Sequence, residues 1–165
     1  MKKLLIVYYS WSCGNTERTA KALQSVAGGD LVRLDTAVPY SGSYNDVVDQ
    51  GQREGNAGFE PELKPLPINV ADYDVIAVGT PTWWYTMAPA VKTFLHGQNF
   101  AGKTVVPFMT NGGWPGRVIK DMKAACPGAD FACDMQVKFD SNGGDHLETP
   151  ESKINAWAQS VKALL

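Results

Sequence analysis

The feature that most constrains the fold of this chain is a short apolar run near its start, followed at once by a polar loop and a helical pattern. The run covers residues 4–9, and it is rich in β-branched and aromatic residues. It is typical of a strand buried on both faces of a parallel sheet. Small hydroxyl residues follow, and apolar residues then keep helical spacing up to Gly28-Gly29, at Ala20, Leu23, Val26 and Ala27. The first 29 residues therefore predict a strand, a loop and a helix.

Strands and helices alternate along the rest of the chain. Further strands are expected at residues 31–34, 75–78, 104–109 and within 131–139. Helices are expected at residues 87–95 and 117–125 and after Thr149, which would cap the last helix with Pro150 in its first turn. This alternation predicts an α/β fold, with three layers around a doubly wound, five-stranded parallel sheet. Pro107 is at odds with the strand expected at residues 104–109, because proline inside a strand removes a hydrogen bond between strands.

Residues 36–72 form an irregular segment, rich in glycine, proline and serine, with a short helix expected at about 45–53. A long connection of this kind is often functional in a compact domain. No repeat or low-complexity tract divides the chain, so residues 1–165 are expected to form one domain.

Charge and cysteine content exclude several classes of protein. The formal net charge is −2 without any basic cluster, so no nucleic-acid partner is expected. Cys13, Cys126 and Cys133 show no paired spacing, which argues against a disulfide framework and a metal site. The first apolar run is too short for an export signal, and no stretch approaches the roughly 20 apolar residues of a membrane span. We therefore expect a cytoplasmic protein.

The loop after the first strand is suited to bind a phosphate group. It contains Ser10, Trp11, Ser12, Cys13, Gly14, Asn15 and Thr16. Its hydroxyls can donate to phosphate oxygens, its glycine allows close approach of the backbone, and the helix that follows offers free N–H groups. The alternative is an ordinary turn, in which Asn15 or Thr16 caps the helix.

The loop differs from three other kinds of phosphate-binding loop. A dinucleotide-binding loop needs G-x-G-x-x-G and a Walker loop needs Gly-Lys before Ser or Thr, and both patterns are absent. A low-molecular-weight tyrosine phosphatase needs C-x5-R, but only four residues separate Cys13 from Arg18, and the chain has no Asp-Pro pair. A phosphatase-like hydrolase is therefore a minor alternative.

Two more loops are expected at the same edge of the sheet. Large aromatic residues follow the third strand, in the series Pro81, Thr82, Trp83, Trp84, Tyr85 and Thr86. Aromatic side chains in a loop cover a flat ligand or pack on a neighbour. Asn111, Gly112 and Gly113 follow the fourth strand, where they permit close approach to a ligand or make a plain turn. Because all three loops follow the carboxyl ends of strands, we expect them to form one site.

At these residues the sequence resembles the flavodoxin family, and in particular a short bacterial branch of flavodoxins and FMN-dependent oxidoreductases. The resemblance rests on residues 6–10 leading to Gly14-Asn15-Thr16, and on the stretches 72–76, 80–84, 87–89 and 102–105. It implies a flavodoxin-like sheet of strand order 2-1-3-4-5 and flavin mononucleotide (FMN) as cofactor. By resemblance, Ser10, Ser12, Gly14, Asn15 and Thr16 hold the FMN phosphate, residues 81–86 line the flavin ring, and residues 111–113 close its other side. The usual loop is S/T-x-S/T-G-N-T, so Cys13 is an extra residue.

The resemblance implies electron transfer, with the chemistry carried by the flavin and no catalytic side chain. Flavodoxins that act as carriers are typically more acidic, so an FMN-dependent NAD(P)H:quinone-type oxidoreductase remains an alternative to an electron carrier. The partner would be a redox protein or a small quinone-like acceptor, and the protein a monomer or homodimer. A cofactor-free binding module is a further alternative. His96 and His146 are expected to be solvated or structural.

Overall fold

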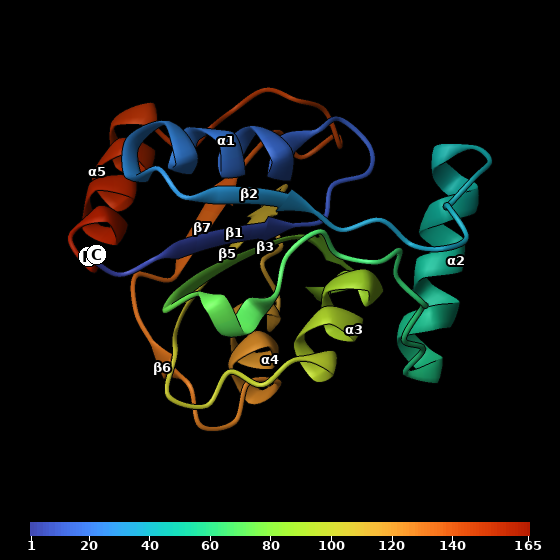
Figure 1. Ribbon diagram of the computed structural model, residues 1–165. Helices are drawn as coiled ribbons and strands as arrows, with labels where there is room; N and C mark the ends of the chain where they lie inside the picture. Colours follow the sequence, from blue (N-terminus) through green and yellow to red (C-terminus); the bar gives the residue numbers. More distant parts are fainter.

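The buried run near the N-terminus forms an inner strand of a parallel sheet in the computed structural model, which describes residues 1–165 (Figure 1). This strand, β1 (Leu4–Tyr8), lies between β2 (Asp30–Arg33) and β3 (Val75–Trp83). Next to β3 comes β5 (Thr104–Asn111), and the outer edge is formed by β6 (Asp130–Phe131) and β7 (Met135–Lys138). The order β2-β1-β3-β5-β6 confirms the predicted order, with the expected fifth strand broken into two pieces.

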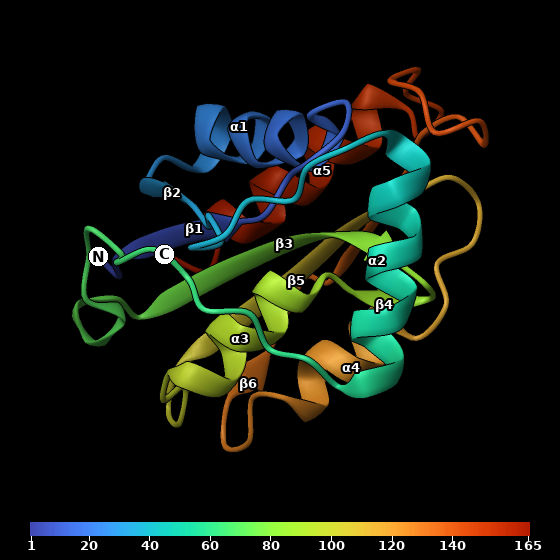
Figure 2. The same cartoon turned by 90° about the vertical axis from the view of Figure 1, so that its right-hand side faces the viewer.

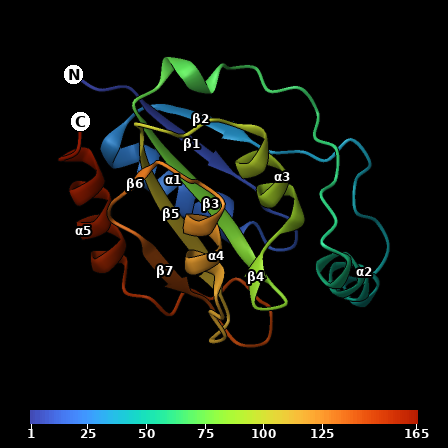
Figure 3. The same cartoon turned by 90° about the horizontal axis from the view of Figure 1, so that it is seen from below.

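Helices cover both faces of the sheet (Figures 1 and 3). One face carries α1 (Asn15–Ala27) and α5 (Glu151–Lys162), and the other carries α3 (Pro89–Gly97) and α4 (Val118–Ala124). Successive residues of a strand point to opposite faces, so Leu5 and Val7 join one core while Leu4 and Ile6 join the other. The three predicted layers are therefore present, and both cores support the strand ends.

The helix α2 (Tyr44–Ala57) belongs to neither layer, and it stands beyond the carboxyl ends of the strands (Figure 2). It starts with a capping box, because the Ser43 hydroxyl accepts from the Asp46 N–H while the Asp46 carboxylate accepts from the Ser43 N–H. The helix is longer than the expected range 45–53. A single 3₁₀ turn, η1 (Val70–Asp72), then leads to β3. None of the helices combines the length and the apolar character that a membrane-spanning helix requires.

The proline inside β5 costs the sheet little, because of the side to which its nitrogen points. The carbonyls of Lys103 and Val105 accept hydrogen bonds from the outer edge of the sheet. Backbone polar groups of alternate residues in a strand point to the same side, so the nitrogen of residue 107 points to that edge too. The edge is interrupted there, since β6 pairs up to Val105 and β7 pairs from Phe108 onward. Pro107 therefore needs no N–H donor, and its conflict with the strand prediction disappears.

Some predicted boundaries were wrong. Two strands run further than expected, β3 to Trp83 and β5 to Asn111, and a two-residue strand β4 (Thr86–Met87) folds back antiparallel on β3. Thr149 does not cap α5, because its hydroxyl accepts the N–H of Lys138 on β7 and Pro150 holds the N-cap position. The Thr149 hydroxyl thus ties the last helix to the sheet edge.

Candidate functional site

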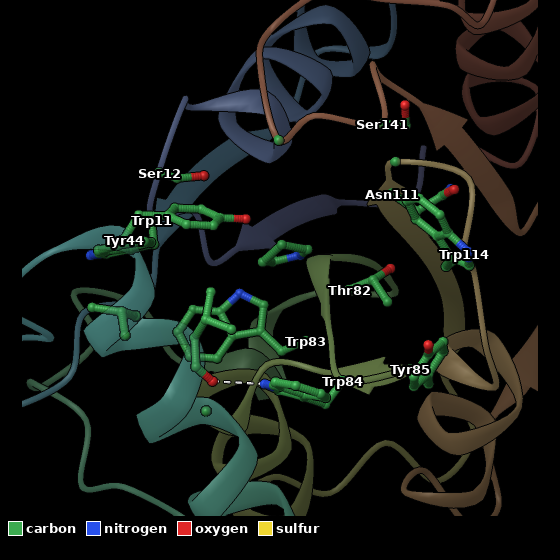
Figure 4. A pocket seen from close by; sticks show the side chains of 16 residues that line it. Trp11, Ser12, Tyr44, Thr82, Trp83, Trp84, Tyr85, Asn111, Trp114 and Ser141 are labelled. Atoms are coloured by element: carbon green, nitrogen blue, oxygen red, sulfur yellow. Dashed lines mark hydrogen bonds between the residues drawn. The ribbon is translucent and has the colours of Figure 1, made fainter.

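A cavity of about 340 Å³ lies beyond the carboxyl ends of β1, β3 and β5, where the three predicted loops meet (Figure 4). The helix α2 forms its outer wall, and the segment after β7 contributes to its rim. Nine of the predicted site residues line it: Trp11, Ser12, Pro81, Thr82, Trp83, Trp84, Tyr85, Asn111 and Gly112. The structure therefore brings all three loops together, as the position of their strands predicted.

Other predicted residues support these loops instead of lining the cavity. Ser10 and Thr16 are buried, and the Thr16 hydroxyl lies 2.8 Å from the Thr110 hydroxyl on β5. The Thr86 hydroxyl donates to the Asp121 carboxylate of α4 at 2.6 Å. These contacts tie the loops to the sheet and to α4.

The remaining predicted residues make turn contacts around the rim. The Gly113 N–H donates to the Asn111 side chain at 2.7 Å, which closes a tight turn after β5. The Cys13 thiol donates to the Gly143 carbonyl at 3.2 Å, and the Asn15 amide donates to the Gly144 carbonyl at 2.9 Å. Both of these contacts join the first loop to the segment after β7.

The backbone of the first loop offers an uninterrupted row of hydrogen-bond donors. Gly14 adopts a left-handed conformation, φ 73°, and α1 starts directly after it. None of the N–H groups of residues 11–17 donates to an acceptor in the protein. Free N–H groups at the N-terminus of a long helix form a binding site for an anion such as phosphate. The cradle formed by these N–H groups is therefore suited to a phosphate group.

Aromatic side chains form the wall next to this cradle. Trp11 stacks on Tyr44 of α2, with ring centroids 6.1 Å apart and an angle of 29° between the rings. Trp83 meets the edges of Tyr9 and Tyr40, at 5.8 and 5.0 Å. Burial raises the pKa of Tyr9 and of Tyr40 above the ordinary value, so both phenols stay neutral. The wall is aromatic and uncharged.

The turn between β3 and β4 is strained and held from several sides. Trp84 and Tyr85 have φ angles of 51° and 67°, a conformation in which residues other than glycine are uncommon. The Trp84 indole donates to the Val48 carbonyl of α2 at 2.7 Å, and the Tyr85 carbonyl accepts from the Arg117 N–H at 2.9 Å. Gly116 packs directly on the Tyr85 backbone, where a Cβ atom would overlap the carbonyl oxygen. Strain of this kind is typical of functional sites.

The sequence reasoning missed the residues that complete the cavity. They come from α2, from the turn after β5 and from the segment after β7: Tyr44, Val47, Val48, Gly51, Trp114, Ser141 and Gly143. The last segment follows a strand of the same sheet and contains Gly143-Gly144, so the rule that ligands bind at strand ends could have found it. Nothing in the sequence placed α2 over the site.

The lining as a whole combines apolar rings with a polar end. No acidic or basic side chain, histidine or cysteine lines the cavity. Its polar side chains are hydroxyl groups, indoles and the Asn111 amide, all of them uncharged. A flat conjugated ring with a phosphate tail fits both the aromatic wall and the row of N–H donors.

Comparison with known proteins agrees with this geometry. The profile of the flavodoxin family matches residues 3–156. A crystal structure of a candidate flavoprotein from Bacteroides eggerthii is 31% identical, covers 99% of both chains and gives a TM-score of 0.77. A flavoprotein from Lactobacillus acidophilus, crystallised in complex with FMN, has the same fold at 22% identity, with 96% of this chain and 99% of that chain covered and a TM-score of 0.71.

A curated relative is NAD(P)H dehydrogenase (quinone) 3 of Rhizobium meliloti, which is 37% identical over 100 residues. The match covers 58% of this chain and 43% of the relative. The chain thus spans less than half of that protein.

Proposed function

This chain belongs to the flavodoxin family, and we propose that it binds FMN in the cavity described above and transfers electrons through it. The observation that carries the proposal is the row of free N–H groups at residues 11–17, directly beside an aromatic, uncharged wall. A phosphate needs the first feature, and a flavin ring needs the second. FMN contains both groups.

Each wall of the cavity would hold a different part of FMN. The N–H groups of residues 11–17 would hold the phosphate, with the Ser12 hydroxyl beside them. The rings of Trp83, Trp84, Tyr85 and Trp114 and the turn at Asn111 and Gly112 would enclose the flavin. When bound, the flavin supplies one- and two-electron redox chemistry, and the protein binds it, orients it and limits the access of water.

An FMN titration with two variants tests this placement. Flavin fluorescence is expected to fall when the ring stacks on the aromatic wall, and the wild-type protein should quench it. Tyr85→Ala should weaken FMN binding by about tenfold, since an aromatic contact contributes roughly 1 kcal/mol beyond area burial. Phe59→Ala is the matched control, because Phe59 is similarly exposed but does not line the cavity. Equal affinities of Tyr85→Ala and the wild type would refute the placement.

A second candidate function is that of an NAD(P)H:quinone-type oxidoreductase. Four aromatic side chains at the cavity are exposed, with fractions of 54% for Tyr44, 40% for Trp84, 54% for Tyr85 and 58% for Trp114, and they offer stacking surfaces for a flat acceptor. The net charge of −2 gives little attraction for a basic protein partner. The name of the Rhizobium meliloti relative, NAD(P)H dehydrogenase (quinone) 3, also supports an oxidoreductase. We place the protein in a reducing compartment such as the cytoplasm, in accord with its three free thiols.

Steady-state turnover separates the two candidates. FMN-loaded protein is mixed with NADH or NADPH and a soluble quinone, and the loss of nicotinamide absorbance is followed. An oxidoreductase should show continuous turnover that depends on both substrates. A carrier should show none without an added reductase protein, and restoration of quinone reduction by a reductase would favour the carrier.

A further inference from the structure

The segment after β7 folds around a single carboxylate. Asp140 accepts hydrogen bonds from the N–H groups of Asn142 and Gly144 through Oδ1, at 3.0 and 2.9 Å. Its Oδ2 accepts from the N–H of His146 at 3.1 Å, and its own N–H donates to the His146 carbonyl at 2.8 Å. These backbone donors lower the pKa of Asp140, so the carboxylate is ionised at neutral pH. The turn formed by residues 140–146 therefore depends on this one side chain.

The turn reaches across to the phosphate cradle. The Gly143 carbonyl accepts from the Cys13 thiol and the Gly144 carbonyl from the Asn15 amide, across about 130 residues of sequence. Cys13 is the extra residue of the loop, and Asn15 is the first residue of α1. Gly144 leaves no room for a side chain, because a Cβ atom would overlap Asp140 Oδ2. The position of the two accepting carbonyls is therefore fixed by the Asp140 carboxylate.

Other contacts of the same turn extend to the rest of the rim. A Cβ atom at Gly143 would lie 3.2 Å from the Tyr44 hydroxyl of α2, so the turn approaches this helix closely. A Cβ atom at Gly112 would lie 3.1 Å from the Asp140 carbonyl, which places the turn against the loop after β5. Gly143 also lines the cavity, as does Ser141 (Figure 4). The Asp140 turn thus connects the cradle with two other walls of the site.

We propose that Asp140 is a positioning residue for the phosphate end of the cofactor, which makes the protein select FMN over riboflavin, the same flavin without phosphate. This inference rests on the proposed function. Asp140 does not line the cavity and acts through Gly143 and Gly144 on Cys13 and Asn15. A loop held in its binding conformation loses less entropy when the ligand binds, so the fixed turn favours phosphate binding.

The expected sign separates positioning from simple electrostatics. A carboxylate close to a phosphate repels it, so removal of the charge alone would strengthen FMN binding. Loss of the hydrogen bonds would loosen the cradle and weaken FMN binding. The two explanations therefore predict opposite changes for the same substitution.

The test measures dissociation constants for FMN and riboflavin by flavin fluorescence. Wild-type protein should bind FMN more tightly than riboflavin. Asp140→Ala should raise the FMN constant by about tenfold and leave the riboflavin constant within about twofold, because the hydrogen bonds that the turn accepts from other parts of the chain come from the first loop and α1, at the phosphate end. Asp145→Ala is the matched control, because it removes the same charge from the same turn, and no hydrogen bond is made by the Asp145 side chain. It should change neither constant.

Several outcomes would overturn the inference. If Asp140→Ala lost affinity for FMN and for riboflavin equally, Asp140 would have a general structural role. Tighter FMN binding by this variant would show that the charge of Asp140 dominates. Equal affinity of the wild type for FMN and riboflavin would remove phosphate selection but leave the proposed function standing. Absence of binding of either ligand to the wild type would refute the proposed function as well.

Asp140→Asn covers the case in which Asp140→Ala does not fold. The amide keeps the shape of the side chain and one oxygen acceptor, so part of the turn should survive. Its FMN constant should lie between those of the wild type and the alanine variant, with riboflavin again unchanged. An asparagine variant that is folded and binds FMN like the wild type would contradict the role of the carboxylate.

Discussion

At the scale of single residues, the site depends on backbone groups more than on side chains. The phosphate cradle is a row of N–H groups, and Gly14 is needed there for its left-handed conformation. Another glycine, Gly79 on β3, leaves space for the ring of Phe108 on β5, where a Cβ atom would overlap it. The Phe108 ring in turn reaches Trp157 of α5, with ring centroids 5.2 Å apart. Small residues thus determine both the site and the packing beneath it.

The hydrogen bonds to the Asp140 carboxylate lead to a prediction about stability in acid. Its pKa is lower in the folded protein than in the unfolded chain, because three backbone N–H groups donate to the charged form. Its contribution to stability is therefore present above the unfolded pKa of about 4 and is lost as the pH falls through the folded pKa. The difference in Tm between wild type and Asp140→Asn should be constant above about pH 5 and shrink below about pH 4. A difference that stays constant down to about pH 3 would contradict this assignment.

The sequence predicted the loops at the residue scale better than it predicted individual contacts. The motif at residues 10–16 was correctly placed at the end of the first strand, but the Thr16 hydroxyl contacts Thr110, and the sequence holds no sign of that pairing. Cys13 and Asn15 meet carbonyls about 130 residues away. Contacts at such a sequence distance depend on the full fold, which a local pattern does not describe.

At the scale of elements, α2 distinguishes the site from an open groove. It closes the cavity from outside through Tyr44, Val47 and Gly51. Few of its residues are buried, and Val47 and Gly51 face the body of the protein. The helix is therefore attached by a small number of contacts. One of them is the hydrogen bond from the Trp84 indole to the backbone carbonyl of Val48.

A tryptophan substitution tests this attachment. Trp84→Phe keeps an aromatic ring but removes the N–H donor, so we expect faster hydrogen exchange in residues 44–57 and a loss of about 1 kcal/mol or less in global stability. Trp114→Phe is the control, since the Trp114 indole makes no hydrogen bond in the structure and α2 exchange should not change. Unchanged exchange of α2 in Trp84→Phe would show that the helix is held by packing alone.

The element boundaries that the sequence missed have local physical causes. Polar and aromatic residues at 80–83 favoured a loop, yet β3 continues through them because β5 pairs with it as far as Pro81 and β4 pairs with its last two residues. The break between β6 and β7 coincides with Cys133, which has a φ of 53° and whose carbonyl accepts from the Trp157 indole at 2.6 Å. Tertiary pairing thus overrides local propensity at both positions.

At the scale of the whole molecule, the doubly wound parallel sheet was predictable because the buried runs and the helices between them alternate regularly, whereas the order of its strands followed from the resemblance to flavodoxins. The convergence of three loops at one sheet edge followed from the same rule. The position of α2 was not predictable, since residues 36–72 carry no pattern that relates them to the sheet. Tyr44 of α2 adds to the exposed aromatic surface at the cavity, which is the reason to consider an oxidoreductase beside a carrier.

The most direct test of the central claim is the absorbance spectrum of the purified protein, before and after addition of FMN and removal of the excess by dialysis. We expect flavin bands that persist after dialysis and are shifted from those of free FMN, because in the proposed placement the ring would lie against aromatic side chains. The Phe59→Ala control should retain the same bands. A protein that remains colourless after this treatment would contradict FMN binding and favour a binding module without cofactor.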